Sequence, residues 1–142
     1  ELGYTVDEIV TLASMVEKET RHYYEFESVS SVFHNRLRDP ANYAFLESDA
    51  TIMYAIHHDT GTRKEDMTHE DVSYVSPYNT YTNIGLPPTP IANPGLASLD
   101  AALDPDDSDY YYFILDKSIN QHRFSRTLEE HERLRRELGY LS

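Results

Sequence analysis

The 142-residue chain contains no cysteine and no tryptophan, and its 12 basic residues are outnumbered by 25 acidic ones. The absence of cysteine excludes disulfides, thiolate metal sites and a cysteine nucleophile. No stretch of about 18 apolar residues and no basic-then-apolar leader occurs, so the chain as given is expected to be a soluble domain. Its net charge of −13 would repel phosphate backbones and anionic headgroups, so nucleic acid is not an expected partner.

The chain is long enough for one domain with a real core and room for a cleft. It also carries twelve tyrosines and five phenylalanines. A tyrosine ring offers a flat apolar face and a hydroxyl group that suit sugar rings, although most tyrosines in any domain are packing residues. The chain starts abruptly, a few residues before a well-capped helix, which indicates a piece excised from a longer protein.

Hydrophobic spacing and capping residues predict four or five amphipathic helices with a small antiparallel sheet near the C-terminus, hence a single α+β domain. A capping box at Thr5 starts a helix that runs to about Thr20, and another at Thr127 starts a final helix that stops near Gly139. Three more helices are expected between them. The first ends near Arg38 and has one apolar face, formed by Val29, Val32, Phe33 and Leu37. The second is shorter and is capped by Ser48 or Asp49, and the third covers Leu96, Leu99, Ala102 and Leu103. Residues 110–116 and 122–125 are expected to pair as strands around a turn at 118–121.

The segment 76–94 has no regular apolar period and contains five of the seven prolines. Proline fixes φ and removes a backbone donor, so the segment is predicted to be a long, stiff loop. Loops of this length without secondary structure are uncommon unless they are functional. Polar and aromatic side chains at Ser76, Asn79 and Tyr81 could line a substrate groove, and an ordinary surface loop fits the pattern about equally well.

Three carboxylates are candidates for chemistry. Glu17 and Glu19 lie at opposite edges of the apolar stripe of the first helix, so the helical wheel does not distinguish them, and two solvated glutamates are the commoner interpretation. Asp49 could be a second catalytic carboxylate or a ligand, although a helix N-cap is its commoner role. The seven histidines show no paired ligand spacing such as H-E-x-x-H, so neither a metal nor another cofactor is expected.

Taken together, these segments resemble the YceG-like family of endolytic murein transglycosylases. Residues 12–20 (LASMVEKET) are similar to the family's leading signature, and further blocks follow in family order over nearly the whole chain: 32–37 (VFHNRL), 46–51 (LESDAT), 76–81 (SPYNTY), 85–91 (GLPPTPI), 93–95 (NPG), 112–113, 122–125 and 130–131. The departures from the family pattern are Glu47 in place of Gln, Ala50 in place of Pro, Ala55 in place of Gly, and Thr89 where Gly is frequent. If Glu47 lies near Glu19, its like charge would disfavour ionisation of one of them.

The resemblance implies that residues 1–142 are a catalytic domain in which Glu19 is the acid and base. The substrate-binding positions that it favours are Ser76, Asn79, Tyr81, Asp49, Glu47 and Asn35. It implies a lytic transglycosylase that cuts the MurNAc-β-1,4-GlcNAc bond of nascent peptidoglycan strands and leaves 1,6-anhydro-MurNAc ends. A hydrolytic muramidase, with Asp49 or Glu47 as base or nucleophile, and a non-catalytic glycan-binding module are the alternatives.

The resemblance also implies a setting for the full-length protein. The family is held at the extracytoplasmic face of the bacterial cell membrane by one N-terminal helix, and a LysM-like module usually precedes the catalytic domain. Neither is expected in this chain, which fits an excised piece. The substrate would be peptidoglycan glycan strands, and peptidoglycan synthases would be the protein partners.

Overall fold

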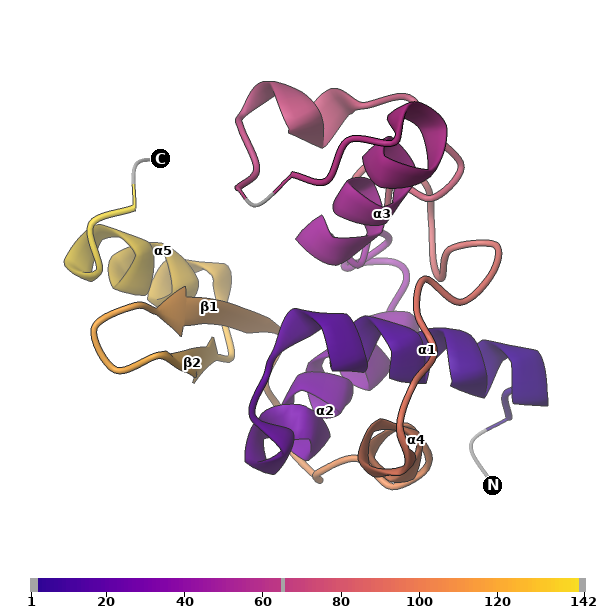
Figure 1. Cartoon of the computed structure of the whole chain (residues 1–142). Coiled ribbons are helices and arrows are strands. Elements are labelled where there is room, and N and C mark those ends of the chain that lie inside the picture. Colours follow the sequence, from indigo (N-terminus) through magenta and orange to yellow (C-terminus); the bar gives the residue numbers. More distant parts are fainter. Residues whose placement is uncertain (1–2, 65, 141–142) are drawn as a thin grey trace.

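The computed structural model describes residues 3–64 and 66–140, in which helix α1 (Val6–Glu19) contacts three other helices. These are α2 (Phe26–Leu37), α3 (Asp49–Thr60) and α4 (Leu96–Leu103), which approach α1 from different sides (Figure 1). A fifth helix, α5 (Leu128–Glu137), lies with a two-stranded antiparallel sheet at the C-terminal end of the fold. The predicted α+β fold is therefore confirmed.

Capping residues set where the first and last helices begin. Thr5 and Glu8 form the predicted capping box of α1: the Thr5 N–H donates to Glu8 Oε1 at 2.9 Å, and the Glu8 N–H donates to Thr5 Oγ1 at 3.1 Å. At α5, the Glu130 N–H donates to Thr127 Oγ1 at 3.1 Å, but the Glu130 carboxylate accepts from the Arg126 N–H instead of from Thr127. The second predicted capping box is therefore only half formed.

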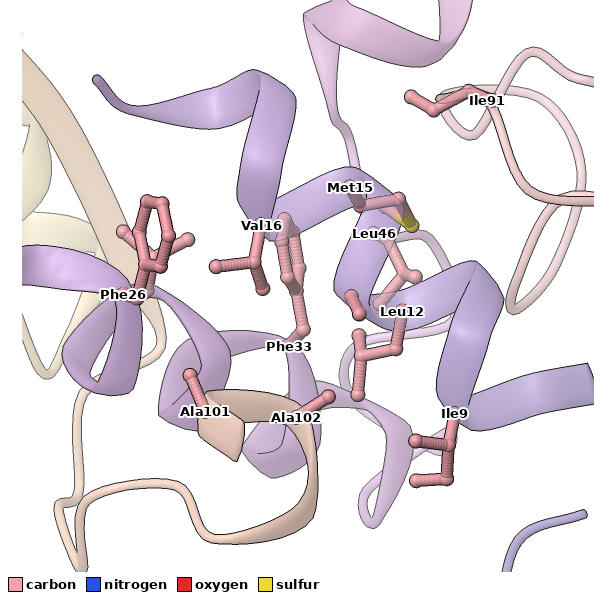
Figure 2. Close-up of a cluster of buried hydrophobic side chains, with 12 residues drawn as sticks. Ile9, Leu12, Met15, Val16, Phe26, Phe33, Leu46, Ile91, Ala101 and Ala102 are labelled. Carbon is pink, nitrogen blue, oxygen red and sulfur yellow. The ribbon is translucent and has the colours of Figure 1, made fainter. Parts of the chain in front are cut away.

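The hydrophobic core lies where α1, α2 and α4 meet (Figure 2). The predicted apolar stripe of α1 is buried, with Leu12, Ala13 and Val16 at most 1% exposed. Single residues from two loops complete the cluster, Leu46 before α3 and Ile91 before α4. Burying a Leu, Val or Phe side chain contributes roughly 1.5–3 kcal/mol, so this cluster holds α1 in a fixed position and orientation.

Helix α3 has 12 residues and is shorter than α1, which has 14. Its apolar residues Ile52, Ala55 and Ile56 are buried as expected, but the helix continues through exposed residues to Thr60. It ends where Gly61 takes a φ of 75°, a left-handed conformation that glycine adopts without steric cost. The apolar spacing set no end for this helix, because residues 57–60 are exposed and polar. Two short 3-10 helices, η1 (Tyr23–Glu25) and η2 (Glu70–Ser73), were also not predicted.

The segment 76–94 contains no helix or strand, as predicted, and the chain then enters α4. The C-terminal hairpin pairs β1 (Tyr112–Asp116) with β2 (Gln121–Ser125), with Tyr112 opposite Ser125 and Asp116 opposite Gln121. Helix α5 packs against both strands. In the part of the chain that the structure describes, no helix combines the length and the apolar character needed to cross a bilayer.

Candidate active site

Glu19 is the last residue of α1 and is partly buried. The buried side chains of Leu12, Met15 and Val16 hold the helix in the core, so the position of its final carboxyl group is fixed by packing. Ser48, which precedes α3, donates a hydrogen bond from its hydroxyl group to Glu19 Oε1 at 3.2 Å. The end of α1 and the start of α3 therefore meet at this carboxyl group.

The pKa of Glu19 is raised from its ordinary value to about 8. Burial of the carboxyl group is the largest cause, because the charged form loses hydration, and the negative charge of Asp49 adds to it. The hydrogen bond from Ser48 acts in the opposite direction but is weaker. At neutral pH, Glu19 is therefore mostly protonated and can donate a proton.

Asp49 and Tyr81 stand beside Glu19. Asp49 is the exposed first residue of α3, and its Oδ1 accepts a hydrogen bond from the Tyr81 hydroxyl group at 2.6 Å. Burial, followed by the negative charge of Asp49, raises the pKa of Tyr81 above its ordinary value, and the charges of Glu47 and Glu19 contribute in the same direction. Four side chains from three separate segments thus share one electrostatic environment, and the tyrosine stays protonated within it.

A buried cluster of hydroxyl groups supports the Ser48–Asp49 corner. The Ser48 N–H donates to Thr80 Oγ1 at 2.9 Å, and the Thr51 hydroxyl donates to the Ser48 carbonyl at 2.8 Å. The hydroxyl groups of Thr51 and Thr80 are also 2.9 Å apart, and all three residues are at most 1% exposed. Sequence reasoning considered Ser48 only as a helix cap and did not single out Thr51 or Thr80, although all three lie in the blocks that carry the family resemblance.

The side chains of Asn79 and Ser76 form hydrogen bonds to the backbone of residues 72–81. The Asn79 side chain is fully buried, its Nδ2 donates to the carbonyls of Val72 and Tyr74, and its Oδ1 accepts from the Tyr81 N–H. Ser76 is half-buried, and its hydroxyl accepts from the Tyr78 N–H at 3.1 Å. The structure therefore brings Tyr81 to Glu19, and it directs the Asn79 carboxamide into the loop that carries Tyr81.

Asn35 is also turned away from Glu19. Its Nδ2 donates to the backbone carbonyls of Ser108 and Tyr110, at 2.9 and 2.8 Å, and its Oδ1 accepts from Arg38. These bonds tie α2 to the segment that leads into β1. A polar residue in a motif can serve the backbone rather than a ligand, and no pattern of residue types distinguishes the two.

Glu47 lies at the rim of the site in a left-handed backbone conformation, with a φ of 55°. Its side chain is about half exposed, and its Oε1 is 3.7 Å from Arg36 Nη1. Arg36 is buried beneath the loop, where it donates to the Phe45 carbonyl at 2.9 Å and to the Tyr111 carbonyl at 2.7 Å. Arg36 therefore joins the loop that carries Glu47 to the start of the hairpin.

Glu17, the other candidate in the first helix, has a different environment. Its Oε1 accepts from the Gly95 N–H at 3.0 Å and from the Ser98 hydroxyl at 2.9 Å, which caps the N-terminus of α4. Glu17 therefore stabilises the contact between α1 and α4, and Glu19 faces the start of α3.

The residues near Glu19 do not form a metal site: the described residues contain no group of three or more His, Asp or Glu side chains arranged to hold a metal ion. The surface has a hollow of about 290 Å³ between β2 and α5. A second hollow, of about 380 Å³, is lined by the start of α1 and residues 85–88. Neither hollow is lined by Glu19, so the site is defined by its carboxyl groups and their partners.

An α+β domain that presents one protonated carboxylic acid beside a second carboxyl group and a tyrosine has the parts of a general acid–base site. The chain belongs to the YceG-like family, whose model matches residues 1–137. A 2.6 Å crystal structure of a YceG-like protein from Listeria monocytogenes has a TM-score of 0.81 and 43% sequence identity, over 91% of this chain and 40% of that chain.

Two curated relatives are named endolytic murein transglycosylase. The one from Bacillus subtilis (strain 168) is 40% identical over 129 residues, and the one from Streptococcus pneumoniae serotype 2 (strain D39) is 34% identical over 135 residues. Each match covers 91% of this chain. The chain spans only 34% of the length of the first relative and 23% of the second.

Proposed function

We propose that this chain is the catalytic domain of an endolytic lytic transglycosylase that cuts peptidoglycan glycan strands, with Glu19 as the acid and then the base. The observation that carries the proposal is the position of the Glu19 carboxyl group, at the end of a helix packed into the core and beside Ser48 and Asp49, where burial and the charge of Asp49 raise its pKa to about 8. The names of the two curated relatives support the same reaction class. Glycosidic bond cleavage requires a carboxylic acid that is still protonated at working pH, which Glu19 supplies.

The reaction can be written with Glu19 as the only proton-transfer group. Glu19 gives its proton to the glycosidic oxygen, the bond from that oxygen to MurNAc C1 breaks, and the GlcNAc end leaves as an alcohol. The carboxylate then takes the proton of the MurNAc C6 hydroxyl, whose oxygen bonds to C1 and closes a 1,6-anhydro ring. Glu19 returns to its neutral form and no water is consumed. Because the nucleophile belongs to the substrate, its effective concentration is high.

The neighbours of Glu19 have supporting roles in this proposal. The charge of Asp49 favours the protonated form of Glu19, and the Tyr81 hydroxyl holds Asp49 in place through their 2.6 Å hydrogen bond. Tyr81, Asp49 and Glu47 are the side chains that we expect to contact the sugar. Asn79, which is fully buried, would act through Tyr81 by fixing its backbone.

A hydrolytic muramidase is the second candidate, because the charge of Asp49 acts on Glu19 and a hydrolase uses two carboxyl groups. The origin of the oxygen at C1 separates the two reactions. In ¹⁸O-labelled water, a lytic transglycosylase gives unlabelled 1,6-anhydro ends, which mass spectrometry detects as the loss of one water relative to a reducing end. A hydrolase gives labelled reducing ends.

Substrate modification gives an independent check. Strands whose MurNAc C6 hydroxyl is O-acetylated should resist cleavage, because the internal nucleophile is blocked. Labelled reducing ends as the main product, or normal cleavage of the O-acetylated strands, would contradict the lytic reaction and give Asp49 or Glu47 the role of base or nucleophile.

We further propose that the full-length protein works at the extracytoplasmic face of a bacterial membrane, beside peptidoglycan synthases. The support is the family to which the chain belongs and the murein substrate in the names of its relatives. Fractionation of cells and cross-linking of the full-length protein would test this, and recovery of the protein in the cytosol would contradict it.

A further inference from the structure

Two exposed tyrosines lie in the segment that joins α1 to α2, a few residues after Glu19. Figure 1 shows the course of this segment between the two helices. Tyr23 is 75% exposed and Tyr24 is 60% exposed. The other ten of the twelve tyrosines are all half-buried. Tyrosine rings in this chain therefore pack against the protein, and these two adjacent rings are the exceptions.

The backbone beneath the two rings is firmly anchored. Glu25 is only 6% exposed, and its Oε1 accepts from the Thr20 hydroxyl at 2.6 Å and lies 2.9 Å from His122 Nδ1. Its Oε2 accepts from the His122 N–H at 2.7 Å. These contacts tie the two ends of the segment, residues 20 and 25, to each other, and they tie Glu25 to the start of β2. A segment held in this way presents its side chains in a nearly fixed arrangement.

The neighbouring histidine adds to this order. His22 Nε2 is 2.7 Å from the Asn120 carbonyl at the turn of the hairpin, and the His22 N–H donates to the Thr20 hydroxyl at 3.1 Å. The His22 ring stacks on the Tyr24 ring, with centroids 5.0 Å apart and an angle of 26° between the planes. Tyr24 therefore has one face supported by the protein, and it loses little freedom when a ligand covers the other face.

The two rings lie near the candidate acid. Tyr23 and Tyr24 follow Glu19 by four and five residues, so their Cα atoms are at most about 14 and 18 Å from that of Glu19 even for a fully extended chain. A polysaccharide whose scissile bond lies at Glu19 continues in both directions, and a few sugars along the strand are enough to reach these rings.

We propose that Tyr23 and Tyr24 form a stacking platform for sugar rings of the glycan strand that flank the bond held at Glu19. The platform rests on the function proposed above and adds a subsite to it. The C–H face of a pyranose ring packs against an aromatic face, and the tyrosine hydroxyl can bond to a sugar hydroxyl. Such contacts need no charge, which suits a chain whose net charge is −13.

Binding of uncut strands tests the platform. The Glu19→Gln variant should cleave roughly 10²–10⁴-fold more slowly, so its affinity for peptide-free glycan strands can be measured by titration calorimetry before the strands are cut. In that background, Tyr23→Ala and Tyr24→Ala should each weaken binding roughly 3–10-fold, and the double variant by roughly tenfold or more. Tyr→Phe at both positions should retain most of the affinity, because the aromatic faces remain.

The matched control is Leu103→Ala, which removes a side chain that is 57% exposed on α4 and should leave the affinity unchanged. Thermal melts identify any variant that weakens binding by loss of the fold. Affinities within twofold of the parent for the double alanine variant would overturn the platform, even if the unmodified chain cuts strands in a Glu19-dependent manner. Absence of both strand binding and cleavage in the unmodified chain would instead overturn the proposed function itself.

Discussion

The two sides of the last turn of α1 show how one residue type takes two roles. On the α4 side, Glu17 accepts two hydrogen bonds, from the Gly95 N–H and the Ser98 hydroxyl, and so caps a helix. On the α3 side, Glu19 accepts one bond, from Ser48, and faces the negative charge of Asp49. The two hydrogen bonds fix Glu17 at the start of α4, whereas burial beside a like charge favours the protonated form of Glu19. The contacts of each glutamate, and not its residue type, therefore distinguish a structural carboxylate from a candidate acid.

The largest expected effect is on cleavage and compares the two glutamates directly. Glu19→Gln keeps the shape of the side chain but cannot donate a proton, so the rate of glycan-strand cleavage should fall by roughly 10²–10⁴-fold with the fold retained. Glu17→Gln is the matched control and should have a much smaller effect. Equal losses in the two variants, or a greater loss for Glu17→Gln, would show that the acid has been assigned wrongly.

A smaller effect is expected from Asp49→Asn, which removes the like charge next to Glu19. Because that charge raises the pKa of Glu19, its loss should lower this pKa, so the acid becomes deprotonated at a lower pH. The alkaline limb of the pH–rate profile should therefore move to lower pH, with activity reduced by roughly 2–5-fold near pH 8 and less near pH 5. An unchanged alkaline limb would exclude Asp49 from this role.

The Glu19→Gln substitution, which should lower the cleavage rate, should raise the free energy of unfolding at high pH. The pKa of Glu19 is about 8 in the folded chain against an ordinary value of 4.5, so the folded state holds a proton that the unfolded state has lost in this range. The contribution of Glu19 to the free energy of unfolding therefore falls as pH rises from 4.5 to about 8. Glu19→Gln should remove this loss and gain on the order of 1–3 kcal/mol above pH 8, allowing for the partial exposure of the side chain. Urea unfolding of the variant and the unmodified chain at pH 5 and pH 9 measures this gain. An equal gain in the free energy of unfolding at the two pH values would contradict the raised pKa of Glu19.

The smallest effect concerns the structural side of the comparison. Glu17→Ala removes the cap of α4 and should lower the free energy of unfolding by about 0.5–2 kcal/mol. Thermal or urea unfolding measures this loss. Since Glu17 contacts the start of α4, whereas Glu19 contacts Ser48 at the start of α3, the pH–rate profile should keep its shape. A shifted profile in this variant would mean that the two sides of α1 are coupled.

The local parts of the fold could be predicted from the sequence. Caps, apolar stripes and the hairpin depend on residues a few positions apart, so α1, α2, α4 and the β1–β2 pair were predicted within a few residues. The helical wheel could not distinguish Glu17 from Glu19, because both lie at the edges of the same apolar stripe, and only the family resemblance favoured Glu19 as the acid. Their partners come from segments about 30 and 80 residues further on, which only tertiary packing brings to α1.

The site illustrates the same limit. The resemblance directed attention to a loop rich in polar side chains, but not to which of them point outward. Asn79 is fully buried because the carbonyls of Val72 and Tyr74 need donors within a loop that has no regular secondary structure. Ser48 was considered only as a helix cap, and Thr51 and Thr80 were not singled out, because hydroxyl residues are common and have no periodic signature. Burial and hydrogen-bond partners, which only the structure supplies, identify their roles.

The most direct test is the titration of Glu19 itself, observed through its side-chain carboxyl ¹³C resonance, with Glu19→Gln used to assign the signal. The account predicts a midpoint near pH 8 for Glu19 and a lower midpoint in the Asp49→Asn variant. A midpoint near the ordinary glutamate value of 4.5, unaffected by Asp49→Asn, would contradict the claim that this residue is the protonated acid of the site.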